Sequence, residues 1–203
     1  MKKIVSIIIL VCMILGGLKI IPLFSEGYKM YREATNEVPI DTMVEKIRND
    51  DSYVSLDEIS DEFLYNLIKI EDRRFKLHFG FDLISMARAT YNNIKAGRIV
   101  EGGSTITQQL AKNMYFSFEK TFQRKIAEVI VAINLERKYS KEDILELYCN
   151  EIYFGEDCYG IKEAANHYYN KSPKKLNSIQ SCELVNSIKC PELYNPNQLN
   201  NAA

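Results

Sequence analysis

The chain opens with its longest apolar run. Residues 4–18 contain only apolar residues, glycine and one serine, and after Lys19 the run resumes to residue 24. About 20 apolar residues cross the hydrocarbon core of a bilayer, so residues 1–24 predict a transmembrane anchor. A cleaved signal peptide is the alternative, but no small-x-small cleavage site follows the run. Lys2 and Lys3 predict a cytoplasmic N-terminus, with the chain from about residue 25 outside the cytoplasm.

The pattern changes twice after this run. Residues 25–52 mix polar and apolar positions and predict a linker or a small lead-in structure. From Asp61 onward apolar residues recur with helical spacing, whereas the alternation typical of strands is absent. Only nine glycines and five prolines occur in the chain. We therefore expect an all-α domain of six or more helices, spanning residues 53–203.

Capping residues predict where several helices begin. Ser60 or Asp61 can start a helix that runs to Glu71. Thr105 and Gln108 have the spacing of a capping box, in which the two residues satisfy each other's backbone N–H groups. Ser140 offers a further start.

Composition limits the classes of protein. A length of 203 residues fits one domain of ordinary size. With 26 basic and 27 acidic residues the formal net charge is −1, which gives no electrostatic reason to expect a nucleic-acid partner. Four cysteines lie beyond the apolar run and could form two disulfides or remain free thiols: Cys149, Cys158, Cys182 and Cys190.

Two glutamates interrupt apolar helix faces. Glu71 follows Leu64, Leu67 and Ile68 on one stripe of the helix expected over residues 61–71. Glu128 is the only charged residue in the segment 126–133, which is apolar all round and predicts a helix buried on every side. A buried carboxylate is costly unless it has a partner, a raised pKa or a cleft to face.

Two interpretations of these glutamates stay open. Each could simply form an ion pair with a nearby arginine, such as Arg74 or Arg124. Together they could instead be the paired carboxylates of an active site, because glycosyl chemistry needs one carboxylate to move a proton and a second group to manage charge.

A glycine-rich segment and a basic cluster lie between the glutamates. Gly102 and Gly103 lead into the helix expected after Thr105, and a helix N-terminus favours an anion. Lys112 lies on the same face of that helix as Thr105, about 10 Å further along. The alternative is an ordinary glycine-loop cap. The basic residues that precede Glu128 are Lys120, Arg124 and Lys125.

These segments resemble the peptidoglycan glycosyltransferase family, which also supplies the N-terminal domain of bifunctional penicillin-binding proteins. The residues from Glu71 to Asp82 resemble its first motif, E-D-x-x-F-x-x-H-x-G-x-D, and Gly103–Asn113 its second. Arg124–Glu128 resemble the third, R-K-x-x-E, and two further motifs follow in order at residues 144–150 and 153–165.

The resemblance implies roles for the candidate residues. Glu71 would be the general base and Glu128 would assist at a leaving pyrophosphate, with a divalent cation, Mg²⁺ or Mn²⁺, as the implied cofactor and no organic cofactor. The substrate-binding residues implied are Ser104, Thr105, Gln109, Lys112, Lys120, Arg124 and Lys125.

The resemblance also implies a fold, a substrate and a location. The fold would be a lysozyme-like helical domain with a membrane-proximal lobe, in a single-pass protein of the bacterial cell membrane. The substrates would be lipid II and the growing lipid-linked glycan, and cell-wall synthesis proteins are conceivable partners. The chain ends soon after the family domain would, which suggests a monofunctional enzyme. A peptidoglycan-cleaving, lysozyme-like enzyme and a non-catalytic scaffold for wall assembly are the alternatives.

Overall fold

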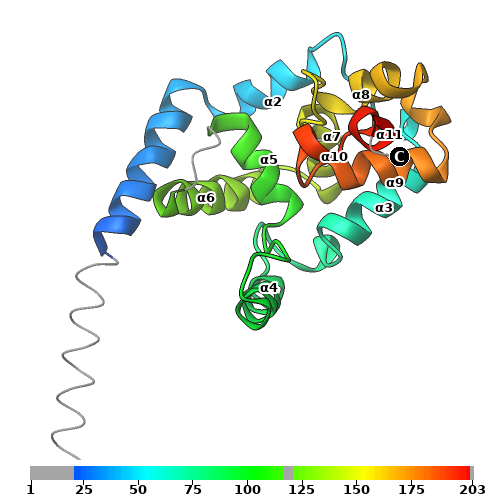
Figure 1. Cartoon of the computed structure of the whole chain (residues 1–203). Helices are drawn as coiled ribbons and strands as arrows, with labels where there is room; N and C mark the ends of the chain where they lie inside the picture. The colour runs from blue at the N-terminus through cyan, green and yellow to red at the C-terminus, as the bar shows by residue number, and fades with distance from the viewer. Residues whose placement is uncertain (1–20, 117–120, 202–203) are drawn as a thin grey trace, which may run out of the picture.

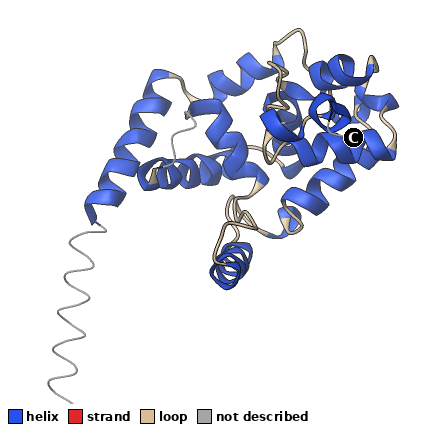
Figure 2. Ribbon diagram, viewed as in Figure 1, coloured by secondary structure: helices blue, strands red, loops and turns tan. Residues whose placement is uncertain are grey.

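The computed structural model describes residues 21–116 and 121–201, which are helical apart from loops and one antiparallel bridge between Tyr153 and Tyr159 (Figure 2). The all-α class is confirmed for these residues. A helix over residues 21–37 comes first. The elements after it are α2 (Ile40–Arg48), η1 (Leu56–Glu58), α3 (Asp61–Glu71), η2 (Phe75–Leu77), α4 (Leu83–Ala96), α5 (Ile106–Tyr115), α6 (Phe122–Lys138), α7 (Lys141–Glu151), α8 (Gly160–Tyr169), η3 (Pro173–Lys175), α9 (Ser178–Ser187), α10 (Pro191–Tyr194) and α11 (Pro196–Asn201).

The helices gather at two ends of an elongated molecule, and α5 joins them (Figure 1). The helix over residues 21–37 lies beside α6 at one end, where a Cβ on Gly27 would come within 2.7 Å of the Cβ of Ile126. At the other end α7 packs against α8 and α3 packs against α9, while α5 contacts both α6 and α7. Helix α4 stands apart from both groups.

The core is centred on α7. Ile144, Leu147 and Tyr148 of this helix are fully buried. Helix α2 adds Val44 and Ile47 to the same core. The polar-looking segment 25–52 thus contains helices rather than only a linker, because one face of α2 is apolar. The domain boundaries at residues 24 and 52 stay predictions.

The predicted helix starts are confirmed. Ser60 is the N-cap of α3. Thr105 caps α5 in a capping box with Gln108, and Ser140 caps α7 in a capping box with Asp143. Local sequence therefore specified these boundaries well.

Helix α6 differs from its prediction. Only one face is fully buried, and it carries Ala127, Glu128, Val131, Ala132 and Leu135. The remaining apolar positions of the segment 126–133 are half-buried: Ile126, Val129, Ile130 and Ile133. The helix over residues 21–37 packs against this second face, with contacts such as the 3.3 Å hydrogen bond from Asn134 Nδ2 to Tyr31 Oη.

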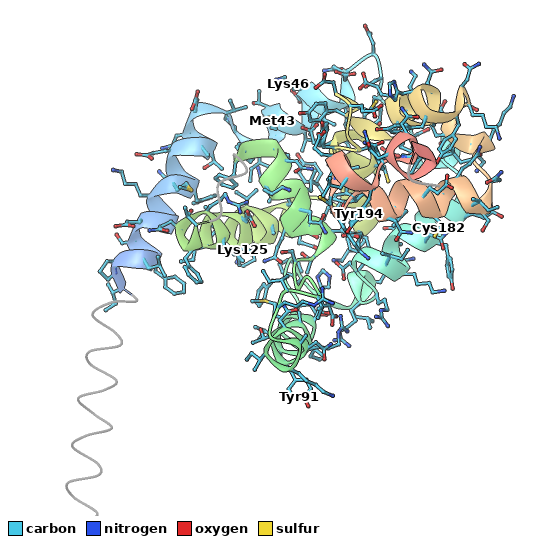
Figure 3. The ribbon with its side chains drawn as sticks, viewed as in Figure 1. Met43, Lys46, Tyr91, Lys125, Cys182 and Tyr194 are labelled. Carbon is cyan, nitrogen blue, oxygen red and sulfur yellow. The ribbon has the colours of Figure 1, made fainter. Side chains whose placement is uncertain are left out.

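The anchor predicted over residues 1–24 lies mostly outside the described residues, which begin at residue 21. Within residues 21–116 and 121–201 no helix is both long and apolar enough to cross a membrane. Helix α4 nevertheless carries many solvent-exposed apolar side chains, and Tyr91 projects from its outer face (Figure 3).

The four cysteines beyond the apolar run are free thiols. Cys149 and Cys158 are buried, and Cys182 and Cys190 are half-buried. Of the two alternatives left open by the sequence, the structure has the unpaired one.

Candidate active site

A cleft of about 660 Å³ brings the predicted site residues together. Its walls come from the end of α3, from α5 and α6, and from the loop between α4 and α5. The predicted residues that line it are Glu71, Ser104, Thr105, Gln109, Lys112, Arg124, Lys125 and Glu128. Lys120, the remaining prediction, lies outside the described residues.

Glu71 is the last residue of α3 and faces the cleft. Its Oε2 accepts a 2.9 Å hydrogen bond from Nε2 of Gln109, whereas its buried Oε1 has no hydrogen-bond partner in the described part of the chain. Burial raises the pKa of the Glu71 carboxyl, and the Gln109 hydrogen bond and the charge of Lys189 oppose that rise. A carboxylate that has a raised pKa and one oxygen without a hydrogen-bond partner in the described part of the chain suits a general base.

Glu128 lies on the buried face of α6 and is 2% exposed. Its Oε1 is hydrogen-bonded to Nη1 of Arg124, and its Oε2 lies 2.8 Å from Nζ of Lys125. The ion-pair interpretation therefore describes Glu128 well. Because both cations also line the cleft, Glu128 fixes two positive charges at the cleft wall.

The cations on α5 and α6 form one cluster. Lys125, labelled in Figure 3, also donates from Nζ to Oγ of Ser104 at 2.8 Å. The Nε of Arg124 is buried with no hydrogen-bond partner among the described residues. Burial lowers the pKa of the Lys112 ammonium, and the charge of Glu128 opposes this. Three cations against one carboxylate suit an anionic group with several oxygens, such as a pyrophosphate.

The N-terminus of α5 is satisfied from within the protein. The Ile106 N–H donates to Oδ2 of Asp72 at 3.0 Å, and the Gln108 N–H donates to Oγ1 of Thr105 at 3.1 Å. The anion expected at this helix start is thus the carboxylate of Asp72. A ligand phosphate would have to rely mainly on the basic side chains.

Asp72 also connects the first and second motifs. Its Oδ2 lies 2.8 Å from Nε2 of His78, and the side chains of both residues are almost fully buried. His78 is therefore a structural histidine. The shared acceptor fixes the end of α3, and with it Glu71, against the start of α5.

Several cleft residues were missed by the sequence analysis. Ile188 and Lys189 follow the end of α9 and line the cleft near Glu71. No local pattern in the sequence connects this segment to Glu71, so the sequence alone does not indicate it as part of the site. Arg73 and Arg88 also line the cleft, and Arg88 Nε donates to Oε1 of Glu101 at 2.7 Å.

The side chains do not fit a resident metal ion. In the part of the chain that the structure describes, no three His, Cys, Asp or Glu residues are grouped as metal ligands would be. Both oxygens of Glu128 already bind cationic side chains.

Residues 37–203 match the sequence model of the family described as Transglycosylase. The chain belongs to this family of peptidoglycan glycosyltransferases. The match confirms the resemblance found in the motifs.

Named relatives agree with this assignment. Penicillin-binding protein 1F of Bacillus subtilis is 50% identical over 143 residues, which are 70% of this chain and 20% of that protein. Penicillin-binding protein 1A of Aquifex aeolicus is 45% identical over 144 residues, 71% of this chain and 20% of that protein. The monofunctional glycosyltransferase of Staphylococcus aureus is 39% identical over 161 residues, 76% of this chain and 60% of that protein. The chain thus spans about a fifth of the length of the first curated relatives it matches.

Proposed function

We propose that the chain polymerises lipid II into β-1,4-linked glycan strands and releases undecaprenyl pyrophosphate, as a step of bacterial cell-wall synthesis. The observation that carries this proposal is that one cleft holds both a buried carboxyl with an open oxygen, Glu71, and a cluster of three cations. Membership of the transglycosylase family supports it, as does the name glycosyltransferase borne by the Staphylococcus aureus relative.

In this proposal Glu71 acts on the acceptor. Its open Oε1 takes the proton from the 4-hydroxyl of the acceptor's terminal sugar, while Oε2 stays bound to Gln109. The hydroxyl oxygen attacks the anomeric carbon of the donor. The bond from that carbon to the pyrophosphate breaks, its electron pair leaves with the phosphate oxygen, and the α-linkage is inverted to β.

The cation cluster acts on the donor. Lys112, Arg124 and Lys125 would bind the pyrophosphate and stabilise the negative charge that grows on it as the bond breaks. The Nε of Arg124, which has no hydrogen-bond partner within residues 21–116 and 121–201, would be a further donor for a phosphate oxygen. Glu128 would hold Arg124 and Lys125 in place, and Ser104, Thr105 and Gln109 would help to position the sugars. We retain Lys120 as a further candidate phosphate ligand.

The divalent cation implied by the family resemblance, Mg²⁺ or Mn²⁺, enters the proposal only as a counter-ion that arrives with the pyrophosphate, because the carboxylates of residues 21–116 and 121–201 do not group as a metal site of their own. Basic side chains can neutralise the leaving group, and no step of the proposed reaction is assigned to the metal.

We further propose a single-pass membrane protein with a cytoplasmic N-terminus, an extracytoplasmic domain with a lysozyme-like core, and a lobe around α4 that meets lipid. The apolar run of residues 1–24 supports the anchor. Exposed apolar side chains support the lobe: Leu83, Ile84 and Ile94 of α4 are each more than half exposed. Membrane lipid and other cell-wall synthesis proteins would be its partners.

The test is polymerisation of labelled lipid II by the purified chain in detergent. Long glycan strands should form, and Glu71→Gln should lose at least 100-fold in rate while its circular dichroism spectrum is unchanged. Shortening of preformed glycan without polymerisation would instead support a cleaving enzyme. Absence of both activities, over a range of detergents and divalent ions, would favour the scaffold.

A further inference from the structure

Tyr148 lies beneath the cleft and is fully buried in α7. Its hydroxyl donates a 2.9 Å hydrogen bond to Oε1 of Gln109. The Nε2 of Gln109 in turn donates a 2.9 Å hydrogen bond to Oε2 of Glu71. Tyr148 of α7, Gln109 of α5 and Glu71 of α3 thus form a continuous series of two hydrogen bonds, which ends on the proposed base. Glu71 and Gln109 line the cleft but Tyr148 does not, so any effect of Tyr148 on a substrate must be indirect.

The chemistry of the three side chains fixes which group donates and which accepts in each of these two hydrogen bonds. An ionised carboxylate can only accept hydrogen bonds, so the amide nitrogen of Gln109 must face Glu71. The amide oxygen then faces Tyr148, which must donate. Burial raises the pKa of the Tyr148 hydroxyl well above its usual value, so the hydroxyl keeps the proton that it donates.

The Tyr148 hydroxyl therefore selects one of two amide orientations. If the amide of Gln109 rotated by half a turn, its oxygen would face the Glu71 carboxylate and repel it. Without the hydroxyl, the amide oxygen would lose the donor that holds it on the side away from Glu71, which favours tilting or rotation of the amide. Either change weakens the hydrogen bond to Oε2 of Glu71.

We propose that Tyr148 is a positioning residue that acts through Gln109, holding the amide so that it binds Oε2 of Glu71 and leaves Oε1 open to receive the proton. This inference rests on the proposed function, in which Glu71 is the general base. It adds a role for a residue that touches neither substrate nor base.

The two hydrogen bonds that connect Tyr148 to Glu71 through Gln109 have a measurable consequence for the Glu71 pKa. The Gln109 hydrogen bond opposes the rise in the Glu71 pKa that burial causes. Removal of the Tyr148 hydroxyl should therefore raise that pKa further, by about 0.5–1 pH unit. A purely structural tyrosine would change stability without moving this pKa.

The direct test is a carbon-13 NMR titration of the glutamate carboxyls of the full chain in detergent micelles, with the Glu71 signal assigned by its loss in Glu71→Gln. Tyr148→Phe should raise the Glu71 pKa. The matched control is Tyr115→Phe, which removes a 2.9 Å hydrogen bond from another tyrosine to the backbone oxygen of Val38. That control should leave the Glu71 pKa unchanged.

A double variant tests the route through Gln109. In a Gln109→Met background, Tyr148→Phe should cause no additional shift of the Glu71 pKa. An equal shift of the Glu71 pKa in both backgrounds would contradict the proposal that Tyr148 acts through Gln109. An unchanged Glu71 pKa in a folded Tyr148→Phe variant would contradict it as well. Because the titration needs no substrate, these outcomes are separate from failure of the proposed polymerase activity.

The kinetic counterpart uses lipid II polymerisation. Tyr148→Phe should reduce kcat about 10-fold with little change in KM, and should move the acidic limb of the pH–rate profile upward together with the Glu71 pKa. A raised KM with an unshifted acidic limb would contradict a positioning role.

Discussion

Glu71, which is half-buried, and Glu128, which is buried, both lie on apolar helix faces, yet their partners give them opposite properties. Glu71 accepts one amide hydrogen bond and keeps Oε1 open. Glu128 has cationic side chains on both oxygens. A base must be able to gain and lose a proton, which suits Glu71. A carboxylate held between two cations is better suited to keep those cations in place.

The charge of Lys189 should lower the pH at which Glu71 becomes able to act as a base. Glu71 must be ionised to act as a base, so the rate should fall as the pH drops through its pKa. Lys189 lowers that pKa, because a nearby positive charge favours the ionised form. We predict that Lys189→Met moves the acidic limb of the pH–rate profile upward by about 0.3 pH unit at low salt, and less at high salt.

The control for this prediction is Lys175→Met, which removes an exposed lysine from η3, outside the cleft. Its profile should match that of the wild type. If Lys189→Met leaves the acidic limb in place at low salt, the charge of Lys189 does not act on Glu71.

These residue properties differ in how far the sequence predicts them. Glu71 and Glu128 stand out because each interrupts an apolar stripe. The partners of Glu128 on the same helix, Arg124 and Lys125, are also visible as neighbours three or four residues away. Tyr148 and Lys189 cannot be linked to Glu71 in this way, since tertiary packing alone brings α7 and the end of α9 to the cleft.

At the scale of helices, the local signals were sufficient for the starts of α3, α5 and α7, because a capping residue acts within one turn. The local signals did not predict features that depend on tertiary packing, such as how deeply each face of a helix is buried. One face of α6, against which the helix over residues 21–37 packs, is only half-buried, and the sequence of α6 carries no sign of this. The role of α2 in the core was missed for a different reason: Ile40, Val44 and Ile47 do recur with helical spacing, but they lie in a short segment among polar residues.

Helix α6 allows a comparison of two buried glutamates. Glu128 lines the cleft, whereas Glu136, two turns later, accepts hydrogen bonds from Thr107 Oγ1 at 2.7 Å and Lys141 Nζ at 2.6 Å. We predict that Glu128→Gln and Glu136→Gln each lose about 2 kcal/mol of unfolding free energy, because each removes a buried carboxylate from half-buried cationic partners. Only Glu128→Gln should also lose most of the polymerisation rate.

Chemical denaturation and lipid II turnover at a temperature where both variants are folded would check this. Equal turnover in the two variants would reduce Glu128 to a structural residue. A selective loss in Glu128→Gln would assign it to the chemistry independently of stability.

At the scale of the whole molecule, the cleft lies between a well-packed helical core and a lobe with an apolar surface. The side chains of Ile94 on α4 and of Ile99 and Val100 in the loop after it are 76%, 85% and 48% exposed. Ile99 and Val100 also line the cleft. An apolar surface that continues into the cleft would let a lipid-linked substrate reach Glu71 without its lipid tail leaving the bilayer.

Fluorescence can test the lobe's contact with lipid, because the chain contains no tryptophan. Ile94 on α4 and Ile179 on α9 have similar exposures, 76% and 71%, so Ile94→Trp and Ile179→Trp form a matched pair. In vesicles that carry the full chain, Ile94→Trp should emit at shorter wavelength and be quenched by lipids with brominated acyl chains, whereas Ile179→Trp should resemble a tryptophan in water. If exposed apolar area alone decided contact with lipid, the two variants would have the same emission wavelength and the same quenching. Only a difference between them in these two measurements supports a membrane-facing lobe. Equal quenching would show that α4 is not oriented toward the bilayer, and the lipid tail of the substrate would then need another path to the cleft.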